Sequence, residues 1–303
     1  MAPVDSFVHL HNHSEYSMLD GAARIKPMVA EAVRLGQPAI GLTDHGYLFG
    51  AYEFYDAATK AGIKPIIGLE AYVTPGTSRF DRQKVTLGEP WQRSDDVSAS
   101  GSYNHLTLIA YSTEGMHNLF RLGSYASVDG QFGKWPRADK ELLERFHKGL
   151  IVFTGCPSGA VQTRMRLGQW DEAAELRDIF GPENFYVEVM DHGIEFERRT
   201  QKQLLELAKL MDAPLVATND AHYVKKEDRG IQDALLCINS GSRISDPDRF
   251  KFDGDGYYIR PSEEMRSIWK ELPQACDSTL EIAERCEVHF RTTAEGASYM
   301  PDF

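Results

Sequence analysis

Two short motifs near opposite ends of the chain contain side chains that bind metals. His11-Asn12-His13 occurs close to the start, and Asp220-Ala221-His222 occurs late in the sequence. Residues i and i+2 of an extended strand project from the same face, so each motif can direct two ligands toward one point. The two motifs therefore outline a metal site.

More side chains of these kinds occur between the two motifs: Asp20, His45, Glu70, His105 and Cys156. A single histidine on an apolar face is usually a hydrogen-bonded core residue. Here, however, five of the ten histidines accompany carboxylates and a thiol in short, unusual contexts. Burying that many ionisable groups separately costs on the order of several kcal/mol each when they are unpaired. We therefore expect them to share one site.

Apolar runs typical of strands alternate with helical patterns along the chain. The strand-like runs cover residues 7–11, 39–43, 65–70, 105–110, 150–154, 185–189 and 215–218, and helical patterns such as 27–35 and 52–61 lie between most of them. Seven parallel strands joined by helices form either an open, doubly wound sheet or a closed barrel. Periodicity does not distinguish the two.

The positions of the polar residues favour the barrel. Most of the metal-type side chains fall at or just beyond the C-terminal ends of the predicted strands, where the active sites of barrels form. His105 is an exception, because it lies at the start of its run. We predict an α/β fold, a distorted TIM-like (β/α)7 barrel with a metal site at the C-terminal ends of its strands.

The predicted barrel domain covers residues 1–262. Within it, residues 74–102 are rich in Gly, Pro, Ser and Asp, a composition that indicates a long polar loop insertion. Helical patterns at 263–270 and 277–286 then form a helical tail, residues 263–303. The tail lacks a clear closing element, so we expect the chain to be one piece of a longer protein.

Composition limits the classes of protein to consider. The chain has 303 residues, 42% of them hydrophobic, which suffices for one large barrel core. A net charge of −12 argues against a free-standing nucleic-acid binder held by a broad basic surface. The cysteines are scattered, no secretory leader is recognisable, and no apolar run approaches the roughly 20 residues of a membrane span. These features predict a cytoplasmic protein without membrane contact.

Several motifs, in order along the chain, resemble one family. They are His11-Asn12-His13-Ser14-Glu15-Tyr16-Ser17-Met18-Leu19-Asp20-Gly21, Thr43-Asp44-His45-Gly46, Gly68-Leu69-Glu70-Ala71-Tyr72, Thr154-Gly155-Cys156-Pro157-Ser158-Gly159 and Asn219-Asp220-Ala221-His222-Tyr223. The chain resembles the polymerase and histidinol phosphatase (PHP) domain, and more narrowly the PHP domain at the N-terminus of bacterial replicative DNA polymerase III alpha subunits. The likeness extends from about Phe7 into the C-terminal tail.

The resemblance implies nine ligands for three divalent metal ions: His11, His13, Asp20, His45, Glu70, His105, Cys156, Asp220 and His222. By family analogy, one ion is held by His11, His13, Glu70 and Asp220, a second by Glu70, His105 and Cys156, and a third by Asp20, His45 and His222. The ligand chemistry agrees independently, because imidazole, carboxylate and thiolate together favour Zn²⁺ or Mn²⁺ over Mg²⁺ or Ca²⁺.

Clustered metal ions activate water and stabilise an in-line displacement at phosphorus, so we predict metal-dependent hydrolysis of a phosphodiester. The resemblance narrows this to 3′–5′ exonuclease proofreading of DNA in cis with a polymerase. Asp20, Asp220 and His222 are the catalytic candidates, and His192, which follows a strand end, is a candidate for contacting a substrate phosphate. The expected partners are the 3′ end of a DNA primer, the remainder of the polymerase chain and other replisome subunits.

Two other functions stay open. The chain could be an inactive scaffold, stabilised by metals, that docks polymerase or exonuclease subunits. It could also be a small-molecule phosphatase, such as a histidinol phosphate phosphatase, with the same metal core. Polymerase activity is not expected, because the resemblance places nucleotide transfer in a palm domain downstream of residue 303.

Overall fold

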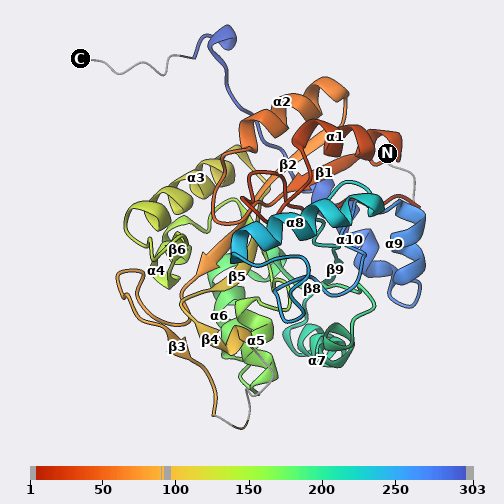
Figure 1. Ribbon diagram of the computed structural model, residues 1–303. Helices are drawn as coiled ribbons and strands as arrows, with labels where there is room; N and C mark the ends of the chain where they lie inside the picture. The colour runs from red at the N-terminus through yellow and green to blue at the C-terminus, as the bar shows by residue number, and fades with distance from the viewer. Residues whose placement is uncertain (1–4, 90, 92–96, 298–303) are drawn as a thin grey trace.

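A computed structural model describes residues 5–89, 91 and 97–297 as a curved sheet surrounded by helices (Figure 1). Residues 92–96 of the predicted loop and 298–303 of the predicted tail lie outside the described residues. The helices are α1 (Ile25–Arg34), α2 (Ala51–Ala61), α3 (Thr113–Val128), α4 (Lys140–Phe146), α5 (Ala160–Arg166), α6 (Asp171–Phe180), α7 (Glu195–Met211), α8 (Arg229–Ser240), α9 (Ser262–Ile268) and α10 (Pro273–Arg285). The strands are β1 (Ala39–Leu42), β2 (Lys64–Val73), β3 (Val85–Thr86), β4 (Ser100–Gly101), β5 (Asn104–Ala110), β6 (Arg137–Ala138), β7 (Leu150–Phe153), β8 (Phe185–Val189) and β9 (Leu215–Ala217).

The main sheet has the strand order β1-β2-β5-β7-β8-β9, with β6 paired to β2. The pairs β1–β2, β7–β8 and β8–β9 are parallel, whereas β5 is antiparallel to both β2 and β7. The expectation of seven parallel strands is therefore wrong for β5. The cause is the connection from β2 to β5, whose described residues contain no α-helix. Without a crossover helix, the chain returns beside β2 in the opposite direction.

Residues 7–11, predicted as the first strand, form an extended segment rather than a regular strand. Its backbone nevertheless bonds to both edges of the sheet. The Gly41 N–H of β1 donates to the His9 carbonyl at 2.7 Å, and the Ala221 N–H beyond β9 donates to the His11 carbonyl at 3.3 Å. The segment therefore closes the sheet into a distorted barrel, which confirms the predicted fold class.

Side chains that point alternately to the two faces of the strands form two separate apolar layers. In β7, Leu150 and Val152 face the surrounding helices, whereas Ile151 and Phe153 belong to an inner cluster. The inner cluster also includes Ile282 and Ala283 of α10 and Cys286, which immediately follows this helix. Part of the predicted helical tail thus packs into the same core, where it closes the barrel at the N-terminal ends of β2 and β7.

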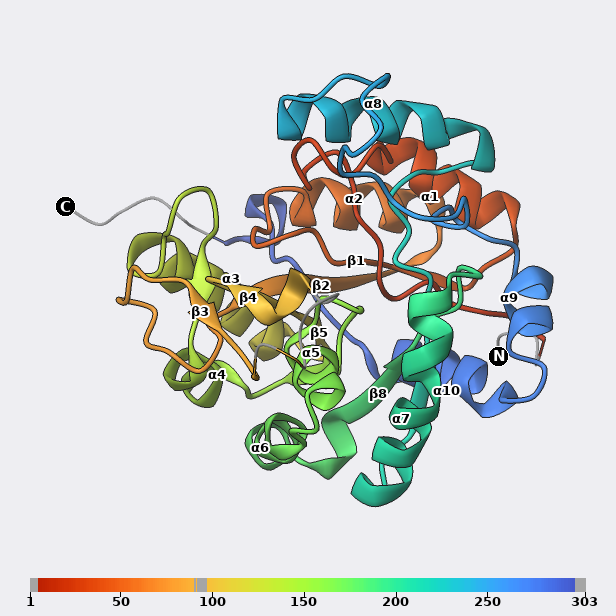
Figure 2. The ribbon, with the colours of Figure 1, turned by 60° about the horizontal axis from the view of Figure 1, so that its bottom comes forward.

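Figure 2 shows α1, α2 and α8 on one side of the strands and α5, α6 and α7 on the other. No helix among the described residues is both long and apolar enough to cross a membrane.

The described part of the 74–102 segment is anchored to the barrel at its beginning. The fully buried Arg137 of β6 donates to the carbonyls of Arg79 and Asp81 at 3.0 and 2.6 Å. Further along, β3 and β4 form a two-stranded antiparallel sheet. These contacts bring the segment alongside the end of the barrel where the metal-type residues lie.

Candidate metal centre

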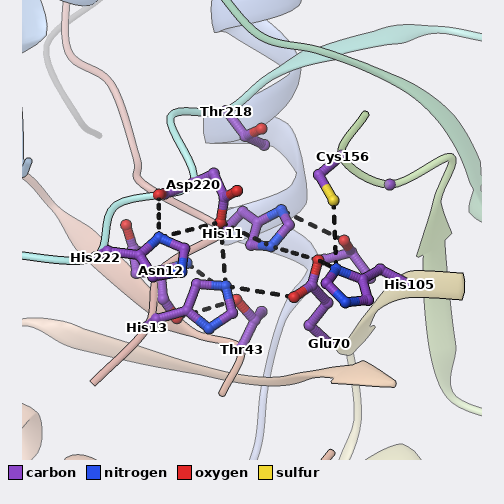
Figure 3. Close-up of polar contacts among 12 residues, drawn as sticks. His11, Asn12, His13, Thr43, Glu70, His105, Cys156, Thr218, Asp220 and His222 are labelled. Carbon is purple, nitrogen blue, oxygen red and sulfur yellow. Dashed lines mark hydrogen bonds and ion pairs between the residues drawn. The ribbon is translucent and has the colours of Figure 1, made fainter. Parts of the chain in front are cut away.

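The reversed direction of β5 places His105 with the other predicted ligands. In the antiparallel register, His105 at the start of β5 lies opposite Tyr72 at the end of β2. The N-terminal end of β5 therefore meets the C-terminal end of β2, two residues beyond Glu70. Figure 3 shows the side chains of His11, His13, Glu70, His105, Cys156, Asp220 and His222 pointing toward one another from these separate elements.

The four residues assigned to a first ion lie within ligand distance of one another. The His11 Nε2 atom is 3.4 Å from both Glu70 Oε1 and Asp220 Oδ1. The His13 Nε2 atom is 3.6 Å from Glu70 Oε2 and 3.1 Å from Asp220 Oδ1. Four donors at about 2.1 Å from a tetrahedral ion stand about 3.4 Å apart, so this spacing fits a shared cation.

The residues assigned to the second ion are also adjacent. The His105 Nδ1 atom lies 3.1 Å from Glu70 Oε1 and 3.5 Å from the Cys156 sulfur. Figure 3 shows Glu70 between His13 and His105. Its two oxygens thus face both groups, as a bridging ligand requires.

The residues assigned to the third ion lie beside those assigned to the first two. The Asp20 Oδ2 atom is 3.2 Å from His45 Nε2, and Asp20 Oδ1 is 3.8 Å from His222 Nε2. The rings of His13 and His222 stack with their centroids 4.2 Å apart. The structure therefore brings all nine sequence-predicted ligands into one cluster.

Many of the donor atoms in this cluster lack hydrogen bonds among the described residues. Seven buried atoms have no hydrogen-bond partner among the described residues: His11 Nε2, His13 Nε2, His45 Nδ1, Glu70 Oε1, Glu70 Oε2, Asp220 Oδ1 and His222 Nε2. Buried polar atoms are ordinarily paired, and an unpaired atom costs about 1–3 kcal/mol. Divalent cations between these atoms would satisfy them, so the residues present fit a cluster of metal ions.

Three histidines are oriented by contacts at their other ring nitrogen. The Nδ1 atoms of His11, His13 and His222 contact Glu188 Oε1 at 2.7 Å, Ser17 Oγ at 2.9 Å and the Asp220 carbonyl at 2.8 Å. A donor Nδ1–H leaves Nε2 as the unprotonated ligand atom. The protein thus fixes which nitrogen of each ring faces the cluster.

Sequence reasoning missed Glu188. This residue lies in β8, every residue of which is buried, and its Oε1 also accepts a hydrogen bond from Thr218 at 2.7 Å. A carboxylate in an otherwise apolar run, Phe185-Tyr186-Val187-Glu188-Val189, was the available signal. Buried charges are normally paired, so an acid in such a strand indicates a partner inside the barrel.

Sequence reasoning also missed Asp44, although it lies inside a quoted motif. Its carboxylate accepts hydrogen bonds from Ser14 N, Ser14 Oγ and Ser17 Oγ at 2.6, 2.8 and 2.7 Å. Because Ser17 in turn contacts His13, Asp44 supports a ligand without touching the cluster. Its neighbour His45 is the metal-type residue of the motif, and the His45 N–H donates to the same Ser17 hydroxyl at 3.1 Å.

The charges in the cluster shift the pKa values of its members strongly. Burial opposes ionisation of Asp20, but the charges of His222 and His45 outweigh it and lower the Asp20 pKa to about 2. Burial likewise opposes protonation of His45, but Glu70 and Asp20 raise its pKa to about 10. The carboxylates are thus held ionised, and they can attract cations.

The pKa values of His13 and Cys156 shift in the directions that favour their neutral forms. Burial, together with the neighbouring His45 and His222, lowers the His13 pKa to about 3, which keeps this ring neutral as a ligand must be. Burial also raises the pKa of the Cys156 thiol well above its usual range, with Glu70 adding to the effect. A bound cation reverses that preference, because coordination deprotonates a thiol.

The backbone adopts positive φ angles at or next to two of the predicted ligands. Asp220 has a φ of +43°, in the left-handed region that non-glycine residues seldom adopt. Gly155, immediately before Cys156, has a φ of +82°. Such turns at the ends of β9 and β7 redirect the chain, so that Asp220 and Cys156 face into the barrel mouth.

The structure does not bring His192 to the cluster. Its Nδ1 contacts Glu197 Oε1 at 2.6 Å, its Nε2 contacts the Asn219 carbonyl at 2.9 Å, and its ring stacks on Tyr257 at 3.8 Å. Its side chain is fully buried and both nitrogens are used by the protein. His192 therefore supports the turn that carries Asp220, rather than presenting a nitrogen to a substrate.

A cleft of about 560 Å³ opens beside the cluster, and Asp20, His45 and His105 line it together with several aromatic residues. Its size lies within the roughly 300–1,000 Å³ typical of ligand sites. The metal-type cluster therefore has a ligand-sized space next to it.

Comparisons with known proteins identify the family of this chain. Residues 9–192 match the PHP domain family. The chain is 58% identical over 93% of its length to the DNA polymerase III subunit alpha of Mycobacterium tuberculosis and 54% identical over 98% to that of Mycobacterium leprae. It spans about a quarter of those relatives, 24% and 26% of their lengths. Among solved structures, a histidinol phosphate phosphatase from Lactococcus lactis, in complex with zinc, L-histidinol and phosphate, is 14% identical with a TM-score of 0.35, covering 78% of this chain and 95% of that one.

Proposed function

Because this chain belongs to the PHP domain family, we propose that its buried cluster binds divalent metal ions and hydrolyses phosphodiesters, removing nucleotides from the 3′ end of DNA. The observation that carries the proposal is the set of seven buried, hydrogen-bond-free donor atoms beside a ligand-sized cleft. The similarity to DNA polymerase III alpha subunits supports DNA as the substrate, with proofreading in cis in the bacterial cytoplasm as the role.

Bound divalent ions would supply positive charge for the phosphate and lower the pKa of a water molecule. The ions are expected to be three, Zn²⁺ or Mn²⁺, in the ligand groups described above. The chain's own residues determine the geometry. Glu70 joins the first two groups through its two oxygens, and Asp220 lies between His11 and His13. Asp20 and His45 line the cleft, which supports a role for both residues at the scissile group.

The test is release of mononucleotides from a primer with a mismatched 3′ end, with Mn²⁺ or Zn²⁺ supplied to the purified chain. Asp20→Asn and Asp220→Asn should each lower the rate at least about 100-fold, because each removes a charged ligand. Asp56→Asn is the matched control, since Asp56 lies on α2 outside the cluster, with its side chain 44% exposed and paired with Lys60. Equal release by all four proteins would point to a contaminating nuclease and sink the proposal.

Two further assays separate the neighbouring functions. Hydrolysis of histidinol phosphate or sugar phosphates, without release of nucleotides from DNA, would indicate a small-molecule phosphatase instead. Incorporation of nucleotides by the chain is not expected, because the proposal assigns it hydrolysis alone.

A second candidate function is a metal-stabilised scaffold that docks the remainder of a polymerase chain or other replisome subunits. Exposed apolar side chains favour it: Ile231 and Ile238 on α8 and Ile244 just after it are 58%, 65% and 62% exposed. Chelation that lowers the melting temperature, with no DNA cleavage under any metal, would support this role over the nuclease.

A further inference from the structure

We propose that the cleft beside the metal cluster holds the unpaired terminal base of a DNA 3′ end, stacked on an aromatic wall formed by Tyr103 and Trp135. The proposal rests on the proposed nuclease function and adds how the substrate is selected. A strand end that is frayed from its template presents a free base, whereas a paired end does not. The cleft would therefore choose unpaired ends by stacking.

The aromatic wall lies directly against the ligand cluster. The rings of Tyr103 and Trp135 have centroids 5.0 Å apart, and Tyr103 stacks on His105 at 5.7 Å with the rings 7° from parallel. Both Tyr103 and Trp135 are only partly buried and line the cleft. A base stacked here places its own phosphate near the cluster, because Tyr103 of the wall stacks directly on His105.

Further apolar side chains that line the cleft are unusually exposed. Met18, Phe49 and Phe250 all line the cleft and are 73%, 66% and 60% exposed. Phe49 stacks on Tyr47, a further lining residue, with centroids 4.7 Å apart. Exposed aromatic side chains gathered around one cleft mark a binding surface. Bases offer them flat apolar partners, since every base has a π-face.

Charge in the cleft matches a nucleic-acid backbone. Lys84 and Lys134 both line it, although the chain as a whole carries a net charge of −12. Lys134 Nζ lies 5.8 Å from the centroid of the Trp135 ring and hydrogen-bonds to Asn239 of α8. Cationic groups next to aromatic faces are the combination by which single strands are held without sequence preference. A duplex end shields its bases by pairing and stacking, so the wall favours a single strand.

The experiment measures binding rather than turnover. A fluorescently labelled oligothymidylate and the same strand with abasic 3′-terminal nucleotides are titrated with the chain, at low salt and with a chelator present so that no cleavage occurs. The intact strand should bind at least about five-fold more tightly than the abasic one, as expected for stacking of one base.

Substitutions of Trp135 test whether the preference for the intact strand comes from the aromatic wall. Trp135→Ala should abolish the difference between the two strands, and Trp135→Phe should keep most of it. Trp91→Ala is the matched control, because Trp91 is 78% exposed but does not line the cleft, and it should bind like the unaltered chain. Melting temperatures of the variants confirm that each is folded.

The outcomes separate this inference from the proposed function. Equal binding of intact and abasic strands, absence of binding to both, or a base preference that survives Trp135→Ala would overturn the inference. A base preference that is lost in Trp135→Ala, in a chain that releases no nucleotides with any metal, would support base binding in the cleft and contradict the proposed nuclease activity.

Discussion

The Nδ1 atom of His11 lies 2.7 Å from the Glu188 carboxylate, and both side chains are fully buried. Burial opposes protonation of His11, but the charges of Asp220 and Glu188 hold its pKa well above the usual range. Glu188 stabilises a ring whose Nδ1 bears a proton, so Nε2 is left to face Glu70 and Asp220. A carboxylate that supports a histidine in this way orients it and raises its basicity as a metal ligand.

Glu188→Gln should therefore weaken metal binding by about 10- to 100-fold. The amide keeps the size of the side chain and can still accept a hydrogen bond from His11, but it lacks the negative charge. Competition with a chromophoric chelator, using Zn²⁺, measures the affinity directly.

Glu172→Gln serves as the matched control for that measurement. Glu172 is largely buried and pairs with Arg164 at 3.3 Å, outside the cluster. Its substitution should leave Zn²⁺ affinity unchanged. If both variants lose affinity equally, or neither does, the supporting role of Glu188 is wrong.

Removal of divalent ions should lower the melting temperature by at least about 5 °C. Seven buried donor atoms of the cluster lack hydrogen bonds among the described residues, and a ligand at 100 times its dissociation constant stabilises a fold by about 2.7 kcal/mol. For a domain of this order of size, 1 kcal/mol corresponds to about 2–4 °C. Thermal unfolding with a chelator, and again after Zn²⁺ or Mn²⁺ is restored, provides the comparison; identical melting temperatures would show that no metal occupies the cluster.

The nine members of the cluster could be predicted from the sequence because ligand types and motif spacing are local properties. The geometry around His105 could not. Strand periodicity carries no direction, so His105 at the start of its run looked misplaced. Only the antiparallel return of β5 beside β2 brings it level with the other ligands. The long connection at 74–102, whose described residues contain no α-helix, was a local sign of that reversal.

Supporting residues were harder to predict than ligands. Glu188 and Asp44 act through histidines that are distant in sequence, so no spacing rule relates Glu188 to His11. The prediction for His192 shows the opposite difficulty. This residue follows a strand and looked accessible, yet Glu197 and the Asn219 carbonyl take both of its nitrogens. Whether a polar residue is free for a substrate depends on contacts that only the assembled fold supplies.

Ile282→Ala should destabilise the chain by about 2–5 kcal/mol without changing its affinity for metal. Ile282 of α10 is fully buried in the inner cluster at the closed end of the barrel, away from the ligands. Urea unfolding and Zn²⁺ titration measure the two quantities. The neighbouring Glu281→Ala, at an exposed position of the same helix, should change neither. A loss of metal affinity in Ile282→Ala would show that the two ends of the barrel are coupled.

The stability of the chain should fall as the pH rises above about 9, partly because of Cys286. This thiol, 1% exposed, closes the barrel with α10, and burial raises its pKa from 9.0 to about 12. Above pH 9 the unfolded chain releases the thiol proton while the folded chain retains it. The folded state therefore loses about 1.4 kcal/mol relative to the unfolded state by pH 10.

Cys286→Ala removes this contribution, so the variant should lose about 1.4 kcal/mol less than the unaltered chain between pH 8 and pH 10. Urea unfolding at both pH values measures the two losses, and any packing defect cancels because it is the same at each pH. Ser278→Ala, on the same helix, alters a group that does not titrate and should leave the pH dependence unchanged. If the Cys286→Ala variant and the unaltered chain lose the same stability between pH 8 and pH 10, the thiol ionises in the folded chain as readily as in water. That outcome would contradict the pKa shift expected from its burial.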